Sequence, residues 1–401
     1  MNQAKIVIGA NYGDEGKGLM TDYFCRRAIN RGLTCLNVCT NGGPQRGHTV
    51  VAPDGHRHVF HHFGSGTLAG ADTYFCDAFI VNPMVFRQEY EELSPICNDF
   101  MVYVNDSCRW TTPYDMILNQ MAEEYRGRAR NGSCGYGIWE TVLRYRNGIA
   151  ARPFGECDEA AVRDVLVFLR DTYIPQRIQE IGLREIPEQW KEILSGAGLI
   201  ENYIEDWRFF QNHTRQADDG VLDRYDTVVF ENGQGLLLDM GRKEVLAHTT
   251  PSFTGLTDPM RILAGSHADI EVCYVTRTYL TRHGAGPMDN ECEKSEINAD
   301  MVDRTNVPNP FQGTLRYGLM DLTSLTGRIR ADMQDSALSI SRVSLAVTHL
   351  NETDGKIVSP DAGTDPHALC PQYFDKVYLS STDCGQYIDV FGTNHEDSFT
   401  F

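Results

Sequence analysis

Ten residues near the start of the chain have the composition of a phosphate-binding loop. The run Gly9–Gly18 reads Gly-Ala-Asn-Tyr-Gly-Asp-Glu-Gly-Lys-Gly, follows the apolar run Ile6–Ile8 and precedes an amphipathic stretch. Closely spaced glycines let backbone N–H groups point inward, a helix N-terminus adds partial positive charge, and Lys17 adds a full charge. Carboxylates in such a cradle repel an anion unless a divalent metal or a proton transfer uses them. Asp14 and Glu15 therefore predict chemistry as well as phosphate binding; the alternative is an ordinary strand–turn–helix corner with solvated acids.

The elements that must position this loop follow an alternating pattern. Apolar, β-rich runs alternate with helical stretches, and the runs cover residues 6–8, 35–39, 227–230, 272–275 and 343–347. This alternation predicts an α/β fold with a mainly parallel central sheet flanked by helices. Ligands of such sheets bind beyond the carboxyl ends of the strands, so the segments after these five runs should converge on one site.

The rest of the chain favours a single domain. Residues 158–196 have helical apolar spacing, interrupted at Pro175, which is typical of a helical cover. Because no low-complexity linker or internal repeat divides the chain, we expect one domain over residues 1–401 with helical insertions at about 85–225.

Composition excludes several classes of protein. The 401 residues are 41% hydrophobic, which is enough for a large core. A net charge of −19 argues against non-specific binding to nucleic acid or to an anionic membrane. The twelve cysteines are scattered without a paired CxxC, and neither a signal peptide nor a long apolar span is evident. We therefore expect reduced thiols and a cytoplasmic protein.

Four ordered motifs resemble those of the adenylosuccinate synthetase family. They are Gly-Asp-Glu-Gly-Lys-Gly at 13–18, Gly-His-Thr-Val at 47–50, Glu-Asn-Gly-Gln-Gly-Leu-Leu-Leu-Asp at 231–239 and Thr-Arg-His-Gly-Ala-Gly-Pro at 281–287. Their order and spacing match the family over most of the chain, whereas a lone GxxxxGK would be weak evidence. The resemblance implies an adenylosuccinate synthetase-like fold with a P-loop-like phosphate site. It also implies a ligase that phosphorylates the 6-oxygen of a purine nucleotide with a nucleoside triphosphate and Mg²⁺, after which aspartate displaces the phosphate.

The same resemblance implies roles for the catalytic residues. Asp14 would be the general base that removes the proton of the purine ring nitrogen, and Asp14 and Gly47 would hold Mg²⁺. Lys17 would hold the 6-oxyanion or the phosphate, and His48 would donate to the transferring phosphoryl group. Gln234 would place its amide against the purine 6-position. The alternative for His48 is a surface histidine in a loop, which its glycine and threonine neighbours disfavour.

The resemblance further implies contacts to the substrate nucleotide. The segment 131–138 resembles the family's 5′-phosphate loop and supplies Ser133 and Cys134. In a homodimer one arginine would reach the neighbouring subunit's phosphate; Arg146 ranks slightly ahead of Arg144, and either can be a solvated helix charge. Two further residues fall in matching nucleotide-contact segments: Asn82 and Thr254.

The donor-nucleotide segment departs from the family pattern. The family's Thr-Lys-Leu-Asp, in which the aspartate accepts two N–H donors from guanine, here reads Thr348-His349-Leu350-Asn351. An amide in place of the carboxylate removes an acceptor and adds a donor, so ATP or dATP becomes the better prediction than GTP. The alternative is that Asn351 merely ends a strand and the base is held elsewhere. The expected donor contacts are Gly16, Gly18, Thr348, Asn351 and Gly392.

The aspartate-binding loop also departs from the family. The family's arginine-rich run ends in Arg-x-Gly-Trp-Leu-Asp, and the corresponding residues 311–321 keep one arginine of four. Arg316 can hold one carboxylate of aspartate in a bidentate fork, with Thr314 assisting. The identity of the amine donor is therefore inferred from the resemblance.

These departures resemble a phage branch of the family that makes 2-aminoadenine nucleotides. Tyr12 stands where the family has tryptophan, and Gly-Pro-Gln-Arg occupies 43–46. The branch joins dGMP to aspartate to give succino-2-amino-2′-deoxyadenylate, in the host cytoplasm where the enzyme is phage-encoded. Part of that branch replaces the acid at Asp14, so its presence here keeps ordinary synthesis from IMP and GTP as an alternative. A third alternative is a nucleotide-binding protein without ligase activity.

Overall fold

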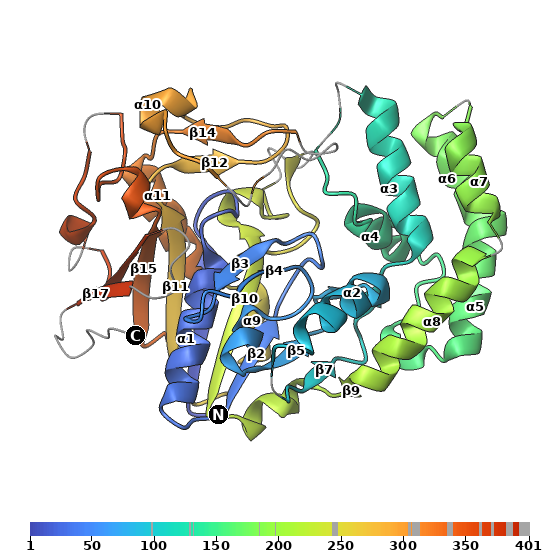
Figure 1. Cartoon of the computed structure of the whole chain (residues 1–401), viewed down its shortest axis with the longest axis horizontal. Helices are drawn as coiled ribbons and strands as arrows, with labels where there is room; N and C mark the ends of the chain where they lie inside the picture. Colours follow the sequence, from blue (N-terminus) through green and yellow to red (C-terminus); the bar gives the residue numbers. More distant parts are fainter. Residues whose placement is uncertain are drawn as a thin grey trace.

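The five apolar runs predicted as strands lie side by side at the centre of a ten-stranded sheet (Figure 1). The computed structural model describes residues 1–97, 99–127, 130, 132–183, 185–196, 198–242, 248–303, 306, 313–334, 340–360, 363–369, 373–381 and 388–392. In spatial order the strands are β17 (Ile388–Gly392), β16 (Lys376–Ser380), β15 (Arg342–Thr348), β11 (Asp269–Arg277), β1 (Gln3–Gly9), β10 (Thr227–Gly235), β2 (Cys35–Cys39), β5 (Asp72–Phe75), β7 (Val102–Val104) and β9 (Arg215–Gln216).

The sheet is parallel except at one edge, which confirms the predicted fold class. Each strand from β16 to β9 runs parallel to its neighbours, and only β17 is antiparallel to its neighbour β16. In the central strand β1, Ile6, Val7 and Ile8 are fully buried because both faces of the sheet are covered. This burial on two faces explains why the run is continuously apolar and does not alternate.

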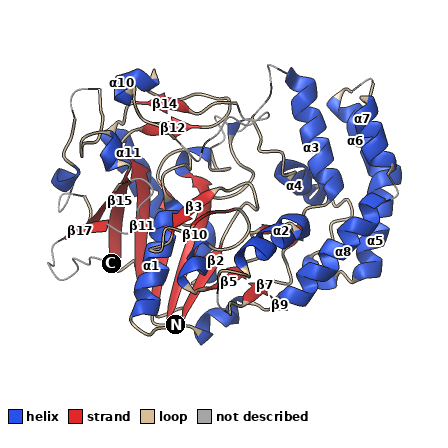
Figure 2. Cartoon of the chain, viewed as in Figure 1, coloured by secondary structure: helices blue, strands red, loops and turns tan. Residues whose placement is uncertain are grey.

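Helices cover the sheet and form a separate block beside it (Figure 2). Helix α1 packs Met20 and Phe24 against Val7, Val229 and Cys273 of the sheet. The block contains most of the helices between β5 and β10, and Trp110 and Trp207 lie in its core. The helices are α1 (Lys17–Asn30), α2 (Pro83–Leu93), α3 (Pro113–Arg126), α4 (Ile138–Arg146), α5 (Glu159–Phe168), α6 (Ile174–Ile181), α7 (Glu188–Ser195), α8 (Gly198–His213), α9 (Thr257–Ile262), α10 (Lys294–Asn298) and α11 (Leu322–Gln334).

Pro175 does not break the helical cover as the sequence suggested. The chain passes from α5 through a π-helical turn at Leu169–Tyr173 directly into α6, and Pro175 lies in the first turn of α6. Proline has no N–H to donate to the preceding turn, and the wider π-helical turn just before it accommodates that missing hydrogen bond.

In the part of the chain that the structure describes, three small sheets lie outside the large one. They are β12 (Leu280–Arg282) with β14 (Arg316–Gly318) and β13 (Glu291–Cys292), β3 (His48–Val51) with β4 (Arg57–Phe60), and β6 (Ile80–Val81) with β8 (Arg109–Trp110). The first two of these sheets carry residues of the predicted site. Within the described ranges, no helix is both long and apolar enough to cross a lipid bilayer.

Candidate active site

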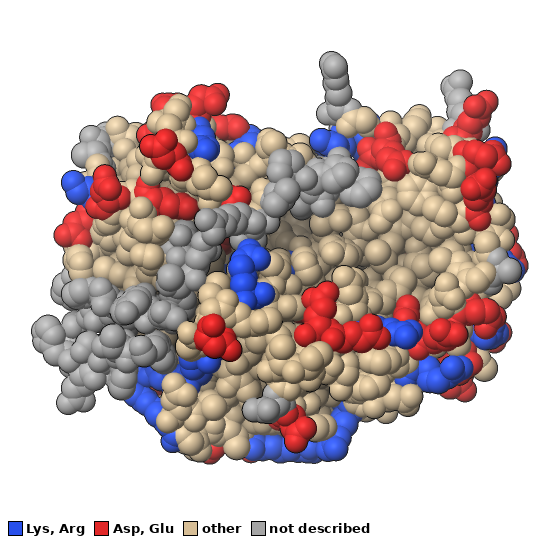
Figure 3. Space-filling view, viewed as in Figure 1, with Lys and Arg blue, Asp and Glu red and all other residues tan. Residues whose placement is uncertain are grey.

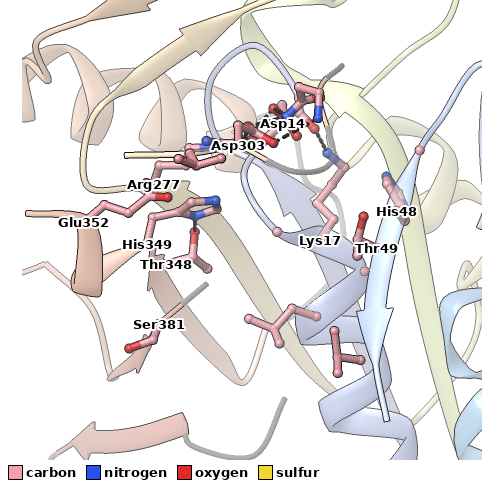
Figure 4. A pocket seen from close by; sticks show the side chains of 18 residues that line it. Asp14, Lys17, His48, Thr49, Arg277, Asp303, Thr348, His349, Glu352 and Ser381 are labelled. Carbon is pink, nitrogen blue, oxygen red and sulfur yellow. Dashed lines mark hydrogen bonds and ion pairs between the residues drawn. The ribbon is translucent and has the colours of Figure 1, made fainter. Parts of the chain in front are cut away.

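A pocket lies where the segments after several strands of the sheet meet, as parallel topology requires. The pocket is partly enclosed and opens to solvent on one side. Figure 4 shows Lys17 and His48 on one side of the pocket and Thr348, His349 and Ser381 on the other. The wall is made by Gly13, Asp14, Gly16, Lys17, Gly18, Leu19, Gly47, His48, Thr49, Val51, Arg277, Val302, Asp303, Asn306, Thr348, His349, Glu352 and Ser381.

The phosphate loop leads into helix α1 with its first N–H groups open to a ligand. Gly16 is the N-cap residue, has a φ of 95°, and provides no side chain to cap the helix. Gly13 has a φ of 107°, and a Cβ there would lie 2.8 Å from the backbone of Gln234, so glycine is required. An uncapped helix N-terminus beside Lys17 is a ready site for an anion.

Only one of the two acids of the loop faces the pocket. Glu15 is buried, and its Oε1 accepts from the backbone N–H groups of Asn11 and Gly13, 2.9 Å from each. Its other carboxylate oxygen lies 3.7 Å from Nζ of Lys17, whose ammonium also donates to the Gly13 carbonyl. Burial raises the pKa of Glu15 and lowers the pKa of Lys17. Glu15 therefore stabilises the conformation of the loop and does not line the pocket. The sequence suggested a chemical role for both acids, and for Glu15 the structure shows a structural one.

Asp14 lines the pocket and is held by a neighbouring arginine. Arg277, at the end of β11, donates to Oδ2 of Asp14 over 2.6 Å and to its backbone carbonyl over 2.5 Å. Asn306 donates to the same Oδ2 over 2.7 Å and to Oδ2 of Asp303 over 2.6 Å. The Arg277 side chain is 3% exposed and that of Asp14 is 25% exposed. One carboxylate thus remains accessible in the phosphate loop while its orientation is fixed.

His48 is bound to a buried carboxylate behind the pocket. Its Nδ1 lies 2.6 Å from Oε1 of Glu231, and Glu231 also accepts from the backbone N–H (3.0 Å) and hydroxyl of Ser65. Burial alone would raise the pKa of Glu231, but the charges of Arg46 and His48 and the hydrogen bonds from His48 and Ser65 hold it at about 2. Burial lowers the pKa of His48 to about 4, although Glu231 opposes the shift. At neutral pH the imidazole is therefore uncharged and donates from Nδ1, which leaves Nε2 for the pocket.

Comparison with known proteins identifies the family of the chain. The sequence profile of the adenylosuccinate synthetase family matches residues 6–341. The chain belongs to the adenylosuccinate synthetase family. Among its relatives, the adenylosuccinate synthetase of Microcystis aeruginosa is 28% identical over 310 residues, which cover 75% of this chain and 64% of that protein. The Streptomyces griseus enzyme is 27% identical, with 72% and 65% covered. The matched part thus spans less than two thirds of these relatives.

Two solved structures support the fold. The fully ligated adenylosuccinate synthetase of Plasmodium falciparum superposes with a TM-score of 0.63 at 18% identity, covering 88% of this chain and 78% of that one. The succinoaminodeoxyadenylate synthetase of cyanophage S-2L, bound to dGMP and dATP as an energy donor, gives 0.60 at 14% identity, with 98% and 96% covered. At these identities the likeness establishes the fold of the adenylosuccinate synthetase family.

The residues that could bind the Mg²⁺ of the family suit a site in which the substrate supplies the remaining ligands. Among the described residues no group of three His, Cys, Asp or Glu side chains forms a metal cage. Mg²⁺ is usually held by one or two protein carboxylates together with substrate phosphates and water. The Asp14 carboxylate and the exposed backbone of Gly47 line the same pocket and suit that arrangement.

Gln234 and Thr254 lie at the turn that ends β10. Gln234 has a φ of 63°, a backbone conformation that costs free energy for a non-glycine residue and often marks a functional site. Thr254 is fully buried and its hydroxyl donates to the Gly235 carbonyl over 3.0 Å. Neither residue lines the pocket described above. Thr254 therefore stabilises the turn that presents Gln234.

The predicted substrate contacts have structural partners. Asn82 is fully buried and caps α2 by accepting from the N–H groups of Met84 and Val85 over 3.1 and 3.3 Å. In the loop before α4, Ser133 donates to Oδ1 of Asn119 over 2.9 Å. Burial raises the pKa of the neighbouring Cys134 thiol to about 11. These contacts order the segments around the expected 5′-phosphate, and direct contact with a nucleotide stays a prediction.

The structure distinguishes the two arginines of α4. Arg144 is fully buried, forms an ion pair with Asp115 in which its Nε lies 3.1 Å from Oδ1, and donates to the carbonyls of Trp110 and Ala150. Arg146 is exposed at the end of the helix. Of the two, Arg146 is therefore the side chain that is accessible at the surface.

Arg316 is not free to grip a ligand in this conformation. Its guanidinium forms a bidentate ion pair with Glu291, at 2.7 and 2.5 Å, and donates to the carbonyls of Gly284 and Gly286. Thr314 is exposed two residues before Arg316. A carboxylate ligand would have to replace Glu291 in the arginine fork.

The predicted donor contacts separate into two groups. Gly16, Gly18 and Thr348 line the pocket, whereas Asn351 is exposed in the short helix Leu350–Glu352 and is not part of the wall. Gly392 pairs with Lys376 at the start of β16, which is the amino-terminal edge of the parallel sheet. The register therefore does not bring Gly392 to the pocket.

Several residues in or behind the pocket wall were not predicted from the sequence. Arg277 lies only two residues beyond the predicted strand 272–275, so the rule that strand ends converge on the site could have indicated it. Glu231 stood inside a recognised motif but had no role until its contact with His48 was seen. Asp303 and Asn306 had no sequence signal, because neither belongs to a recognised motif or a predicted strand.

Proposed function

We propose that this protein is a C–N ligase that joins aspartate to carbon 6 of a 6-oxopurine nucleotide. The observation that carries the proposal is the convergence of Asp14, Lys17 and His48 on one pocket at the N-terminus of α1. A nucleotide-binding protein without catalysis would need the N–H groups and Lys17 but not a paired histidine and an accessible carboxylate.

The first chemical step is phosphorylation of the 6-oxygen. Asp14 accepts the proton of the adjacent ring nitrogen, and the resulting 6-oxyanion attacks the γ-phosphorus as the bond to the bridging oxygen breaks. Lys17 and the first N–H groups of α1 hold the phosphates. His48 faces the transferring group while Glu231 stabilises positive charge on its ring. When bound, Mg²⁺ adds positive charge at the phosphoryl oxygens.

The second step forms the carbon–nitrogen bond. The amino group of aspartate attacks carbon 6, the carbon–oxygen bond breaks, and inorganic phosphate leaves as the nitrogen loses a proton. Arg316, assisted by Thr314, would hold a carboxylate of aspartate after exchanging Glu291 for it. The exchange replaces one carboxylate by another, so the arginine keeps its charge partner.

We further propose dGMP as the substrate and ATP or dATP as the phosphoryl donor. Guanine has the same 6-oxo group as hypoxanthine, so the chemistry is unchanged. The proposal is supported by Asn351 in place of the guanine-reading aspartate and by Tyr12 in the phosphate loop. The cyanophage S-2L enzyme, which matches this chain over nearly its full length, binds dGMP and dATP. The second candidate is ordinary adenylosuccinate synthesis from IMP and GTP, which the presence of Asp14 favours.

Product analysis tests these proposals. The protein is incubated with ATP, Mg²⁺ and aspartate, with IMP, GMP or dGMP in separate reactions, and products are identified by mass spectrometry. A succinylated product from dGMP supports the proposal, and product from IMP alone supports the second candidate. The Asp14→Asn variant keeps the size of the side chain and should form no product with any substrate. Absence of product from the unaltered protein with all three nucleotides would refute ligase activity.

A further inference from the structure

We propose that His349 selects the base of the phosphoryl donor by accepting a hydrogen bond at Nε2 from a purine 6-amino group. The inference rests on the proposed function only in taking a nucleoside triphosphate as the ligand of this pocket. It places donor specificity on the residue before Leu350, whereas the sequence pointed to Asn351, the residue after it.

His349 is fixed in place by an unusual backbone conformation. It follows β15 immediately, has a φ of 63°, and lines the pocket across from Lys17 and His48 (Figure 4). Left-handed backbone at a non-glycine residue persists only where the surroundings enforce it. Its carbonyl accepts from the Thr278 hydroxyl over 3.4 Å, and its ring lies edge-on to that of Tyr279 with centroids 6.3 Å apart.

The hydrogen bonds of Thr348 determine which ring nitrogen of His349 carries the proton. The Thr348 hydroxyl oxygen lies 2.8 Å from the Glu15 carbonyl, 3.2 Å from the Thr276 carbonyl and 2.8 Å from Nδ1 of His349. A hydroxyl has one proton, and a carbonyl can only accept. If that proton went to Nδ1, the hydroxyl lone pairs would face two carbonyl oxygens. The favourable arrangement has the hydroxyl donate to a carbonyl and Nδ1–H donate to the hydroxyl.

This arrangement leaves a bare lone pair on Nε2, facing the pocket (Figure 4). Burial lowers the pKa of His349 well below its usual value, and the charge of Arg277 lowers it further. The ring is therefore neutral, and Nε2 acts as an acceptor at neutral pH.

The two sides of the pocket consequently differ in hydrogen-bonding character. The side of α1 offers backbone N–H groups and the Lys17 ammonium, which suit phosphates. On the opposite side the Arg277 guanidinium is paired with Asp14, and the acceptors are Nε2 of His349 and the carboxylate of Glu352, which accepts from the Tyr279 hydroxyl. Polyphosphate oxygens would be repelled by these acceptors, whereas N–H groups of a base would be attracted. The triphosphate is thus expected to lie with its phosphates on α1 and its base at His349.

An acceptor at this position distinguishes purines at carbon 6. Adenine has an amino group there, which donates, whereas hypoxanthine and guanine have an oxygen, which only accepts. The lone pair of Nε2 would face the lone pairs of that oxygen. A site that pairs a donor on the correct ligand rejects an analogue that places an acceptor there, because neither group finds a partner.

Binding of ATP and of inosine triphosphate, measured by calorimetry with Mg²⁺ but without purine monophosphate or aspartate, tests the inference. The two nucleotides share sugar and phosphates, and their bases differ at carbon 6 and in the ring N–H that accompanies the 6-oxo group. The unaltered protein should bind ATP about tenfold more tightly. The His349→Asn variant should bind the two nucleotides within about threefold of each other. Asparagine tolerates a positive φ and can donate its amide N–H to Thr348 as Nδ1–H does, but has no atom at the place of Nε2.

Two controls make the result decisive. Asn351→Asp alters the residue that the sequence favours, and it should leave the preference for ATP over inosine triphosphate unchanged. The preference for ATP over dATP should be the same with and without His349→Asn. A His349→Asn variant that keeps the full preference for ATP over inosine triphosphate overturns the inference, as does one that changes only the ribose preference. Because no ligase turnover is measured, an inactive protein with intact ATP preference would refute the proposed function and not this inference.

Discussion

At the scale of single residues, the pair His48–Glu231 shows how a charge can be made to depend on the ligand. Glu231 keeps its negative charge in a buried position because Arg46, His48 and Ser65 surround it. His48 stays neutral in the free protein because burial outweighs that charge. A cationic ring without a ligand would add a third buried positive charge beside Lys17 and Arg46, and neutrality avoids that cost.

Binding of a triphosphate should raise the pKa of His48. The anion adds negative charge beside Nε2 and favours the protonated ring, so the pKa should rise from about 4 toward the usual histidine range. Below the raised pKa the ring donates to the phosphoryl group from Nε2–H. Side-chain NMR titration with and without a non-hydrolysable ATP analogue measures the shift, and His48→Asn identifies the signal. A His48 pKa that stays near 4 in the complex would exclude an imidazolium donor.

At the scale of elements, the sequence was sufficient to predict those strands whose structure follows from a local pattern of residues. The strands β1, β2, β10, β11 and β15 were predicted because long apolar runs need burial on both faces. The last two strands of the sheet, β7 and β9, contain three and two residues, which is too short for a periodic signal. The role of Arg277 depends on its contact with Asp14, which lies far away in the chain, and no local pattern encodes that contact.

The packing of α1 against β3 gives a prediction about Gly18. A Cβ at Gly18 would lie 2.9 Å from Cβ of His48 and 3.2 Å from its backbone carbonyl carbon. Gly18→Ala should therefore move the strand that carries His48 and lower kcat by about tenfold or more, since small displacements of catalytic groups are costly. Gly327 in α11 is the matched control, because a Cβ there meets nothing within 4 Å.

Gly327→Ala should leave kcat unchanged and raise the free energy of unfolding by roughly 0.5–1 kcal/mol, as alanine favours a helix. Steady-state kinetics and urea unfolding of both variants measure these effects. Equal kcat values for Gly18→Ala and the unaltered protein would show that the contact between α1 and β3 does not position His48.

At the scale of the whole molecule, the net charge is negative although the site must bind anionic phosphates. The protein carries a net charge of −19, and on the face in Figure 3 acidic side chains spread over the helical block while basic ones gather along the lower rim. An acidic protein repels nucleotides at long range. Affinity for phosphate must therefore come from short-range groups such as Lys17 and the N-terminus of α1, and higher salt should weaken the repulsion.

The exposed position of Arg146 leads to a prediction about assembly. The prediction is that Arg146 completes the nucleotide site of the partner subunit in a homodimer. A dimer of two Arg146→Ala subunits would then have two inactive sites, and so would a dimer of two Asp14→Ala subunits. A mixed dimer would hold one site with both changes and one site with neither. Dissociating and reassociating equal amounts of the two variants should then restore about one quarter of the unaltered activity, since half of the dimers are mixed and each has one intact site. Arg144→Ala serves as the contrast, because loss of the buried partner of Asp115 should destabilise the subunit itself. Recovery measured by product formation would place Arg146 across the interface, and a mixture that stays inactive while forming mixed dimers would place it outside the partner's site.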